Sequence, residues 1–455
     1  MKRTLLYLIL CALLSTIQAQ DLARRAFLGV RLGAVTEELK NELKLVDLNG
    51  AHVQQVYDAS TAKAAGLQAG DVLVKLGENS ITNGQDFIQK IKAFQTGDKV
   101  NLAYFRNGKK EELELELMGF PEERYEGATM IYRSVETATG LHRSIMSLPE
   151  NVKIPAVVYI IQGIDCGSVD AAFAPQSGIA QLVRHFNNKG FATYRVEKSG
   201  VGDGKGKACT ECDFEEDKNI FLEALKELKN SDEVNPEEVY LLGLSMGGVW
   251  APLIANEVKV KGVMAYGTIA RPMAEYMLEN SRRQALLGEV DVERLEQSLK
   301  NDAQLYHYLY NEKLSPEEII ENHPFLEARM REISSERDPE AKIRHLHAGR
   351  LYQFQVQLHN TNISQAWKNL DAHVLAVWGK GDYVSNKEDH ELIRDIVNAY
   401  HPGKGSLAMV DGNHWFEKAS SEAEAFENRR LQKQVPLNTE IFNTFSDWIN
   451  KIRGV

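Results

Sequence analysis

One serine lies between two glycines in the stretch LLGLSMGGVW, residues 241–250. Ser245 follows the apolar run VYLLGL and precedes VWAPLIANEV, so the sequence predicts a strand, a tight turn and then a helix. Gly243 and Gly247 would let neighbouring backbone approach such a turn closely, which a serine that only capped the helix would not require. The G-x-S-x-G pattern alone is a weak signal in a chain with 33 glycines, but this context predicts a nucleophilic serine.

A serine hydroxyl attacks a carbonyl group efficiently only with a base beside it and an acid that orients the base. Asp382 follows the expected strand HVLAVWGKG, and His414 follows SLAMVDGN, so each lies just past the end of a strand and after Ser245 in the chain. Asp411 is a competing acid, but it shares a short loop with the histidine and would struggle to point back at the ring. The spacing therefore predicts Ser245 as nucleophile, His414 as base and Asp382 as orienting acid.

Residues 128–455 begin with an expected antiparallel pair and then alternate apolar strands with amphipathic helices. This alternation predicts an α/β domain with a mostly parallel sheet that is covered on both faces. The interval of about residues 271–370 contains helical patterns and no comparable strand, which predicts a helical cap over the site. Aromatic residues on its helices could contact a ligand, although such residues more often serve packing: Tyr306, Tyr308 and Tyr310.

Residues 27–118 have a different pattern, with short β-like runs, one helical stretch and turn signals such as RNG at 106–108. These features predict a separate, mainly-β domain of about 90 residues. The segment GFPEERYEG, residues 119–127, is rich in charges and turn formers and is the expected linker.

This first domain resembles PDZ domains of the kind attached to bacterial envelope proteases, through FLGV at 27–30, AAGLQAGDVLVKLG at 64–77 and the turn at Gly108. The resemblance implies that backbone N–H groups bind a peptide carboxylate while the peptide adds a strand. The residues that match this loop are Leu28, Gly29 and Val30, and the helix residues that would line the groove are Phe87, Ile88 and Ile91. The alternative is a domain that docks on its neighbour with an empty groove.

The second domain resembles the α/β-hydrolase superfamily, especially bacterial serine esterases and the related serine aminopeptidase-like group. Four motifs carry the resemblance together: GLSMGG at 243–248, VLAVWGKGD at 374–382, GNHWF at 412–416 and SGVGDG at 199–204. It implies an acyl-enzyme on Ser245, an oxyanion hole made by the N–H groups of Met246 and Ile164, and no metal or organic cofactor. One departure is Gln162, since family members often carry a histidine before the glycine of that loop.

The N-terminus predicts export. Lys2 and Arg3 precede the apolar run LLYLILCALLSTI, and Ala19 offers a small residue for cleavage, so residues 1–19 are the expected signal peptide of a periplasmic or secreted protein. The apolar run is too short to span a membrane. Removing the two cations changes the formal charge from −11 to −13, and so acidic a chain is a poor partner for nucleic acid or anionic lipid.

Three cysteines remain after cleavage, which in an exported protein suggests one disulfide and one spare thiol. Because the loops that carry Cys166 and Cys209 would both lie at the sheet edge of the nucleophile, we expect a disulfide between them that braces the oxyanion loop. The pair CTEC at 209–212 lacks a second CxxC for zinc. The HLH sequence at 345–347 could also bind a metal, but no third ligand is evident and a surface position is favoured.

Three functions fit these patterns. The first is an exported serine hydrolase that cleaves small-molecule carboxylic esters. The second is a serine peptidase or aminopeptidase that uses the PDZ-like domain to bind peptide C-termini. The third, from another class, is an inactive peptide-binding scaffold, against which the intact set of Ser245, Asp382 and His414 argues.

Overall fold

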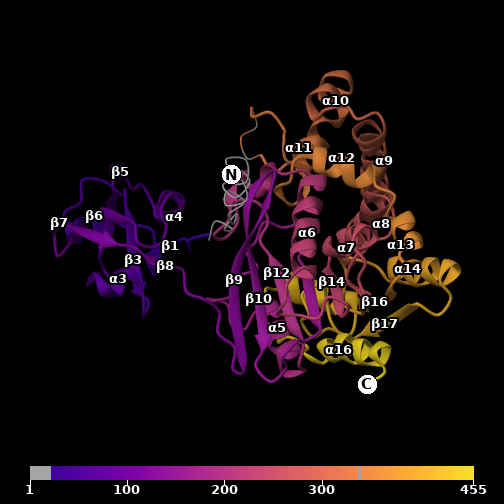
Figure 1. Cartoon of the computed structure of the whole chain (residues 1–455). Coiled ribbons are helices and arrows are strands. Elements are labelled where there is room, and N and C mark those ends of the chain that lie inside the picture. The colour runs from indigo at the N-terminus through magenta and orange to yellow at the C-terminus, as the bar shows by residue number, and fades with distance from the viewer. Residues whose placement is uncertain (1–21, 337, 339) are drawn as a thin grey trace, which may run out of the picture. The chain divides into compact units, whose positions relative to one another are not determined.

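The computed structural model describes residues 22–336, 338 and 340–455. The chain divides into two compact units between Glu122 and Glu123 (Figure 1). This division falls inside the segment 119–127 that the sequence indicates as a linker. The predicted signal peptide, residues 1–19, lies outside the described residues. In the part of the chain that the structure describes, no helix is both long and apolar enough to cross a bilayer.

The first unit is mainly β, as predicted. Its antiparallel sheet has the order β2-β3-β4-β6-β7, with β5 beside β4, and β1 pairs separately with β8. The strands are β1 Ala26–Phe27, β2 Val30–Gly33, β3 Ala51–Val56, β4 Val72–Leu76, β5 Asn79–Ser80, β6 Lys99–Arg106, β7 Lys109–Glu116 and β8 Met118–Gly119. The helices are α2 Glu37–Leu43, α3 Thr61–Ala64 and α4 Gly84–Ile91.

Local sequence explains the longest hairpin of this unit. Asn107 and Gly108 join β6 to β7 with φ values of +50° and +74°, and a two-residue hairpin turn with positive φ at both positions matches the twist of its strands. Along β6, Val100, Leu102 and Tyr104 are buried on one face of the sheet, at every second residue. The alternation that predicted strands from the sequence thus reflects a half-buried sheet.

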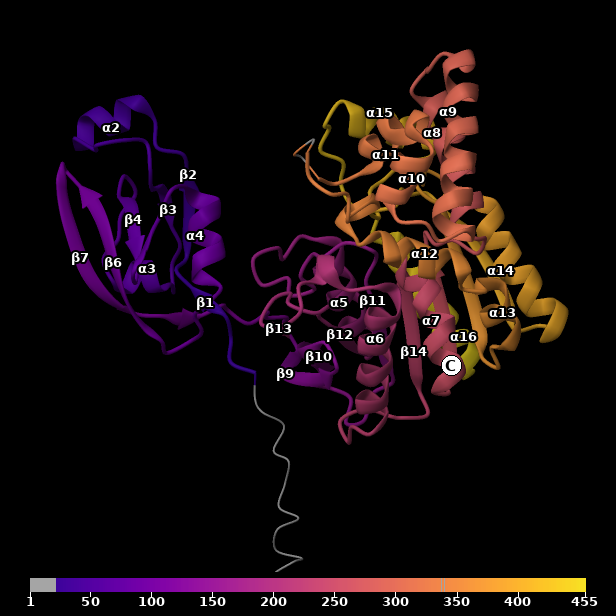
Figure 2. The same ribbon diagram turned by 90° about the horizontal axis from the view of Figure 1, so that it is seen from above.

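The second unit is built on a mixed sheet with the order β13-β10-β12-β11-β14-β15-β16-β17, and β9 pairs with β10 (Figures 1 and 2). Pairs from β12 to β17 are parallel, whereas β9, β10 and β13 are antiparallel to their neighbours. The strands are β9 Ala128–Thr137, β10 Gly140–Pro149, β11 Val157–Ile161, β12 Ala192–Val196, β13 Lys205–Gly206, β14 Val239–Leu244, β15 Gly262–Tyr266, β16 His373–Gly379 and β17 Gly405–Val410.

Helices cover both faces of this sheet, so its central strands are buried throughout. In β11, Val157, Tyr159 and Ile161 join one apolar cluster while Val158 and Ile160 join another. The first cluster includes residues of α6 Phe214–Lys229, α7 Gly247–Glu257 and α14 Lys387–Tyr400, and the second includes residues of α5 Gly178–Asn188 and α16 Glu440–Arg453. Two buried faces require the continuous apolar strands that the sequence shows.

A helical insertion separates β15 from β16, as predicted. It comprises α8 Met273–Leu287, α9 Val292–Tyr306, the π-helical turn His307–Asn311, α10 Pro316–Asn322, α11 Glu327–Ile333, α12 Tyr352–Asn360 and α13 Ile363–Asn369. Tyr306 and Tyr310 are buried and stack on each other, and Tyr308 stacks on His323. The packing role that the sequence favours is thus confirmed for Tyr306 and Tyr310, whose buried rings are not free to contact a ligand. The second unit therefore has the expected α/β-hydrolase fold with a helical cap.

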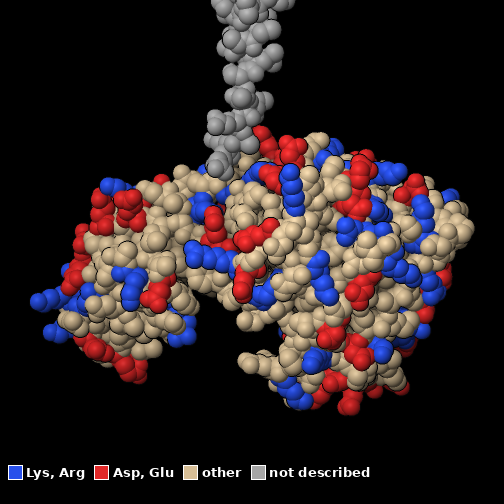
Figure 3. Space-filling model, turned by 60° about the horizontal axis from the view of Figure 1, so that its bottom comes forward, with Lys and Arg blue, Asp and Glu red and all other residues tan. Residues whose placement is uncertain are grey.

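Figure 3 presents one face of the molecule, on which acidic and basic side chains are interspersed. The described residues of that face form no continuous basic patch of the kind that tracks a phosphate backbone.

Candidate active site

Ser245 lies at the tight turn between β14 and α7. Its φ is +54°, in the left-handed region, and its N–H donates to the carbonyl oxygen of Tyr266 at 2.9 Å. The glycines on either side are required by contact: a Cβ at Gly243 would lie 2.4 Å from the carbonyl oxygen of Gly247, and a Cβ at Gly247 would lie 2.1 Å from that of Ile161. The turn therefore holds the serine in a strained conformation, as a nucleophile elbow does.

Asp382 and His414 meet past the ends of β16 and β17. His414 Nδ1 and Asp382 Oδ2 are 2.9 Å apart, and the carboxylate is fully buried. Asp382 Oδ1 accepts from the N–H groups of Val384 and Ser385, both at 2.9 Å, and Oδ2 also accepts from Ser385 Oγ at 2.7 Å. Burial raises the pKa of this carboxyl, but the charge of His414 and hydrogen bonds from His414 and Ser385 outweigh burial and lower it. Asp382 therefore stays ionised and its position is fixed.

The competing acid lies elsewhere. Asp411 pairs with Lys380 at 2.8 Å, and its side chain is 64% exposed. The structure thus brings Asp382, and not Asp411, to the histidine.

Gly267 lies next to both Asp382 and His414, and the residue before it contacts Ser245. A Cβ at Gly267 would lie 2.9 Å from both Asp382 Oδ2 and His414 Nδ1, and the residue before it accepts the N–H of Ser245. Among the described residues, no hydrogen bond joins the Ser245 hydroxyl to His414. In enzymes that use a serine nucleophile, the hydrogen bond between the serine and its base is often long without ligand and tightens when substrate binds.

A cavity of about 230 Å³ opens beside Ser245. Both residues predicted to form the oxyanion hole, Ile164 and Met246, are on its wall. Within the described chain, neither N–H group donates to an acceptor, so both are available to a ligand. The rest of the wall is mostly apolar with a few polar groups: Gly267, Thr268, Ile269, Met273, Tyr276, Met277, Asn280, His347, Ala348, Val384 and Ser385.

The cap contributes wall residues that sequence reasoning missed. Met273, Tyr276, Met277 and Asn280 come from one face of α8, at the spacing of an amphipathic helix. That spacing identifies a buried face, but it does not say whether the face packs on protein or lines a cavity.

The surface position predicted for the HLH sequence is wrong for His347. His347 lines the cavity, and its Nε2 atom is buried without a hydrogen-bond partner. Burial, with a contribution from the charge of Arg329, lowers its pKa to about 4, so the ring is neutral at pH 7. His345 instead contacts Glu211 at 2.8 Å and Glu336 at 2.9 Å. The described residues contain no group of three or more side chains that could hold a metal ion.

Cys166 and Cys209 form a disulfide, with their Cα atoms 5.8 Å apart. Cys166 lies two residues beyond Ile164, so this link reaches the loop whose N–H group is a candidate oxyanion donor. Cys212 is free and buried. Burial, with smaller contributions from the charges of Asp217 and Glu216, raises the pKa of this thiol to about 11.

In the first unit, the loop predicted to bind a peptide carboxylate is preorganised. Gly29 has a φ of +77°, and a Cβ there would lie 2.1 Å from Ser60 Cβ. In the described structure the N–H groups of Leu28 and Gly29 donate to no acceptor, while Val30 opens β2. The groove expected beside α4 needs a correction, because Phe87 is 3% exposed and packs in the domain core. Ile88 is exposed and Ile91 is half-buried, so these two are the helix residues that a peptide could contact.

Comparison with known proteins places the first unit in a family. Residues 26–117 match the family model of the PDZ domain. A probable DegP-like periplasmic serine endoprotease of Bartonella henselae is 30% identical over 104 residues, which are 23% of this chain and 20% of that protein. The corresponding protein of Pseudomonas fluorescens is 35% identical over 99 residues, 22% of this chain and 21% of its own length. The chain thus matches only about a fifth of these relatives.

Solved structures are similar over most of the chain. Est1E from Butyrivibrio proteoclasticus is 17% identical, covers 68% of this chain and 98% of its own, and has a TM-score of 0.39. An esterase of Pyrococcus furiosus is 11% identical, covers 73% of this chain and 96% of its own, and has a TM-score of 0.43. The fold of the second unit is assigned from its own strand order and from the position of Ser245 after β14. Residues 26–117 therefore form a PDZ domain, and the unit that follows has the α/β-hydrolase fold.

Proposed function

We propose that this protein is an exported serine hydrolase that cleaves carboxylic esters through an acyl-enzyme on Ser245. The observation that carries the proposal is the buried contact of 2.9 Å between His414 Nδ1 and Asp382 Oδ2, close to a serine in a strained turn. A nucleophile, a base and a group that orients the base are the parts that acyl transfer requires.

In the proposed mechanism, His414 Nε2 takes the proton of the Ser245 hydroxyl as its oxygen attacks the ester carbonyl carbon. Asp382 keeps the proton of the neutral ring on Nδ1 and stabilises the imidazolium that forms. The N–H groups of Ile164 and Met246 bind the oxyanion of the tetrahedral intermediate. His414 then protonates the departing alcohol, and water, activated by the same ring, releases the acid from Ser245.

The cavity favours an uncharged substrate. Half of its wall residues are methionine, isoleucine, valine or tyrosine, none is aspartate, glutamate, lysine or arginine, and the histidine on it is neutral at pH 7. A charged acyl group would lose its hydration there without an opposite charge among the wall residues. We therefore expect esters with neutral acyl groups to be the preferred substrates.

A fluorophosphonate probe tests the nucleophile. The wild-type protein should be labelled and Ser245→Ala should not, because the probe reacts with an activated serine. Equal labelling of both proteins would remove Ser245 from the mechanism, and no labelling of either would favour the inactive scaffold. Hydrolysis of p-nitrophenyl esters with acyl chains of increasing length then measures how much of the cavity the acyl group fills.

A serine peptidase is the second candidate, and the PDZ domain is the observation that favours it. Free N–H groups at Leu28 and Gly29 suit a peptide carboxylate, and the relatives matched over this domain are named as endoproteases. Aminoacyl p-nitroanilides tested beside the esters distinguish the two. A kcat/KM for the anilides above that for the esters would make the peptidase the better assignment.

Export is supported by the N-terminal pattern of the sequence and by the disulfide, since disulfides persist in oxidising compartments. Mass spectrometry of the mature protein should find a new N-terminus at Gln20. An N-terminus that keeps Lys2 and Arg3 would contradict cleavage at Ala19.

A further inference from the structure

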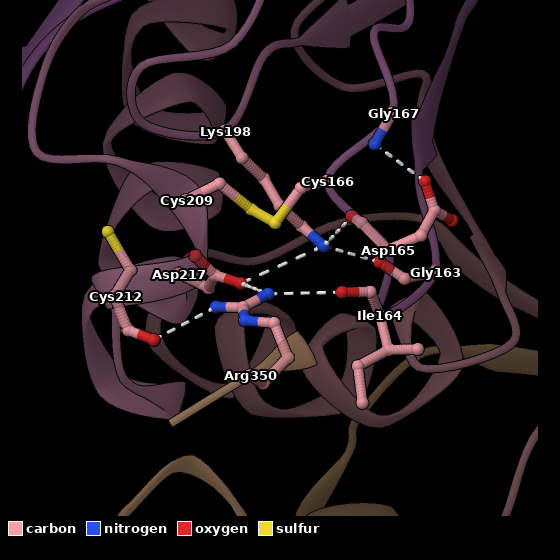
Figure 4. Close-up of a disulfide and its surroundings, with 10 residues drawn as sticks. All are labelled: Gly163, Ile164, Asp165, Cys166, Gly167, Lys198, Cys209, Cys212, Asp217 and Arg350. Carbon is pink, nitrogen blue, oxygen red and sulfur yellow. Dashed lines mark hydrogen bonds and ion pairs between the residues drawn. A yellow bond between two sulfur atoms is a disulfide. The ribbon is translucent and has the colours of Figure 1, made fainter. Parts of the chain in front are cut away.

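A buried cluster of charged side chains lies behind the candidate oxyanion loop (Figure 4). Lys198, Asp217 and Arg350 have no exposed side-chain surface. Arg350 Nη1 is 2.8 Å from Asp217 Oδ2, and Lys198 Nζ is 3.7 Å from the same oxygen. Two cations thus share one carboxylate, and the cluster has a net positive charge.

These cations bind three successive carbonyl groups of the loop. Lys198 Nζ donates to the carbonyl oxygens of Gly163 at 2.5 Å and Asp165 at 2.8 Å. Arg350 Nη1 donates to that of Ile164 at 3.0 Å. Figure 4 shows both side chains directed at the loop from the side on which Asp217 lies.

The hydrogen bond from Lys198 to the carbonyl of Gly163 acts on the candidate oxyanion donor, the N–H of Ile164, through a single peptide unit. The carbonyl of Gly163 and the N–H of Ile164 belong to the same peptide unit, and no peptide bond among the described residues is cis. In a planar trans peptide these two groups point in opposite directions. A cation that holds the carbonyl on one side therefore fixes the N–H on the other, and it also polarises the N–H toward an oxyanion.

We propose that Lys198 is a positioning residue that aims and polarises the Ile164 N–H as an oxyanion donor, and that Arg350, which shares Asp217 with Lys198, is a positioning residue that holds the next peptide unit of the loop. The loop lies close enough to the nucleophile for this role, because a Cβ at Gly163 would lie 3.2 Å from Ser245 Cβ. Ile164 itself is on the wall of the cavity beside Ser245. The inference rests on the proposed function, since it assigns a role in the same reaction.

The energetics of burial argue that this cluster does more than stabilise the fold. Removing three charged groups from water is costly, and buried ion pairs are often no more stabilising than apolar side chains of similar volume. Burial lowers the pKa of Lys198 to about 8 against the opposing charge of Asp217, so the amine is still a cation at pH 7. The hydrogen bonds that the charged amine donates to the loop carbonyls offset the free-energy cost of burying it.

The cluster also joins segments that are far apart in the sequence. Arg350 comes from the cap, yet its Nη2 donates to the carbonyl oxygen of Cys212, and the disulfide between Cys166 and Cys209 ties the other end of the loop to the same region. Each of residues 163–166 is thus fixed, either by a hydrogen bond to its carbonyl oxygen or by the disulfide. A preorganised loop of this kind does not have to reorganise when charge develops in the transition state.

Lys198→Met, which removes the charge while keeping an unbranched side chain, tests the proposal at pH 7 with p-nitrophenyl acetate. We expect kcat to fall about 10- to 100-fold with KM within about 3-fold of wild type, because a misaligned donor weakens only the transition state. Arg350→Met should act in the same direction. Lys198→Gln keeps an N–H donor, so its kcat should lie between those of Lys198→Met and the wild type. The same variant tests the proposal if Lys198→Met does not fold.

Arg143→Met is the matched control. It breaks a buried ion pair with Asp203 at 2.8 Å in the same unit, so it reports the general effect of losing a buried cation. A kcat for Lys198→Met equal to that of Arg143→Met would overturn the proposal.

Crystal structures of wild type and Lys198→Met give a readout that does not depend on activity. The peptide between Gly163 and Ile164 should rotate when the amine is lost, and an unmoved peptide would also overturn the proposal. If the wild type hydrolyses no ester but the peptide still rotates, the proposed function fails while the control of the peptide by Lys198 stands.

Discussion

Replacing Asp382 with asparagine should inactivate the site while leaving its shape almost unchanged. The two oxygens of Asp382 are not equivalent: Oδ1 accepts from two backbone N–H groups, and Oδ2 faces His414 Nδ1. The asparagine oxygen must take the Oδ1 position, because an amide nitrogen there would face two donors. Its NH₂ group therefore points at His414 Nδ1 and favours the tautomer with the proton on Nε2. That nitrogen then cannot accept the proton of Ser245.

The magnitude follows from the interactions lost. A hydrogen bond to a charged group contributes about 1.5 to 3 kcal/mol, and a buried donor left without a partner costs about 1 to 3 kcal/mol. Together they amount to roughly 3 to 6 kcal/mol in the transition state, or about 10²- to 10⁴-fold in kcat. Steady-state hydrolysis of p-nitrophenyl acetate measures this loss, and fluorophosphonate labelling of the wild type gives the active fraction.

Asp411→Asn is the control, since it is the same substitution in the loop of His414. Asp411 is exposed and paired with Lys380, so kcat should stay within about 2-fold of wild type, as for most surface substitutions. The assignment of Asp382 would be refuted if Asp382→Asn kept more than a tenth of the wild-type kcat. An equal loss in both variants would also refute it.

Three further predictions concern stability and thiol chemistry. Replacing Cys166 and Cys209 with serine removes a disulfide whose cysteines are 43 residues apart in the sequence. Urea unfolding without reductant should then show a free energy of unfolding of the second unit that is lower by about 4 kcal/mol, and an unchanged midpoint would contradict this. Burial raises the pKa of Cys212 to about 11, so this thiol should resist iodoacetamide at pH 8 in the folded protein and react after unfolding. Labelling at equal rates in the folded and unfolded states would be inconsistent with a buried thiol. Burial lowers the pKa of His142 from 6.5 to about 4. The neutral ring therefore contributes on the order of 3 kcal/mol to the free energy of unfolding above pH 6.5, and this contribution is lost as pH falls toward 4. His142→Gln should flatten the fall in melting temperature over that range, and an unchanged slope would refute this assignment.

The fold class could be predicted because local patterns report it. The apolar strands of residues 157–161 and 239–244 are continuous because both faces of the sheet are covered, and the hairpin at Asn107 and Gly108 is set by two residues. Strand and turn signals predicted the mainly-β first domain in the same way, whereas its identity as a PDZ domain was expected from the resemblance of its motifs to that family. Phe87 was misjudged as a groove residue, because helical spacing identifies a buried face without saying what covers it.

The sequence by itself determined which residues follow the strands that supply Ser245, Asp382 and His414. Parallel strands bring their carboxyl ends to one edge, so residues far apart in the chain meet there without any signal beyond strand order. Only the tertiary structure decided what surrounds them: the cavity wall with His347, and the cluster of Lys198, Asp217 and Arg350. The contact of Arg350 with Ile164 spans 186 residues, and no local periodicity or motif encodes a pairing at that separation. Such contacts depend on how the cap packs on the sheet, which is a property of the folded chain.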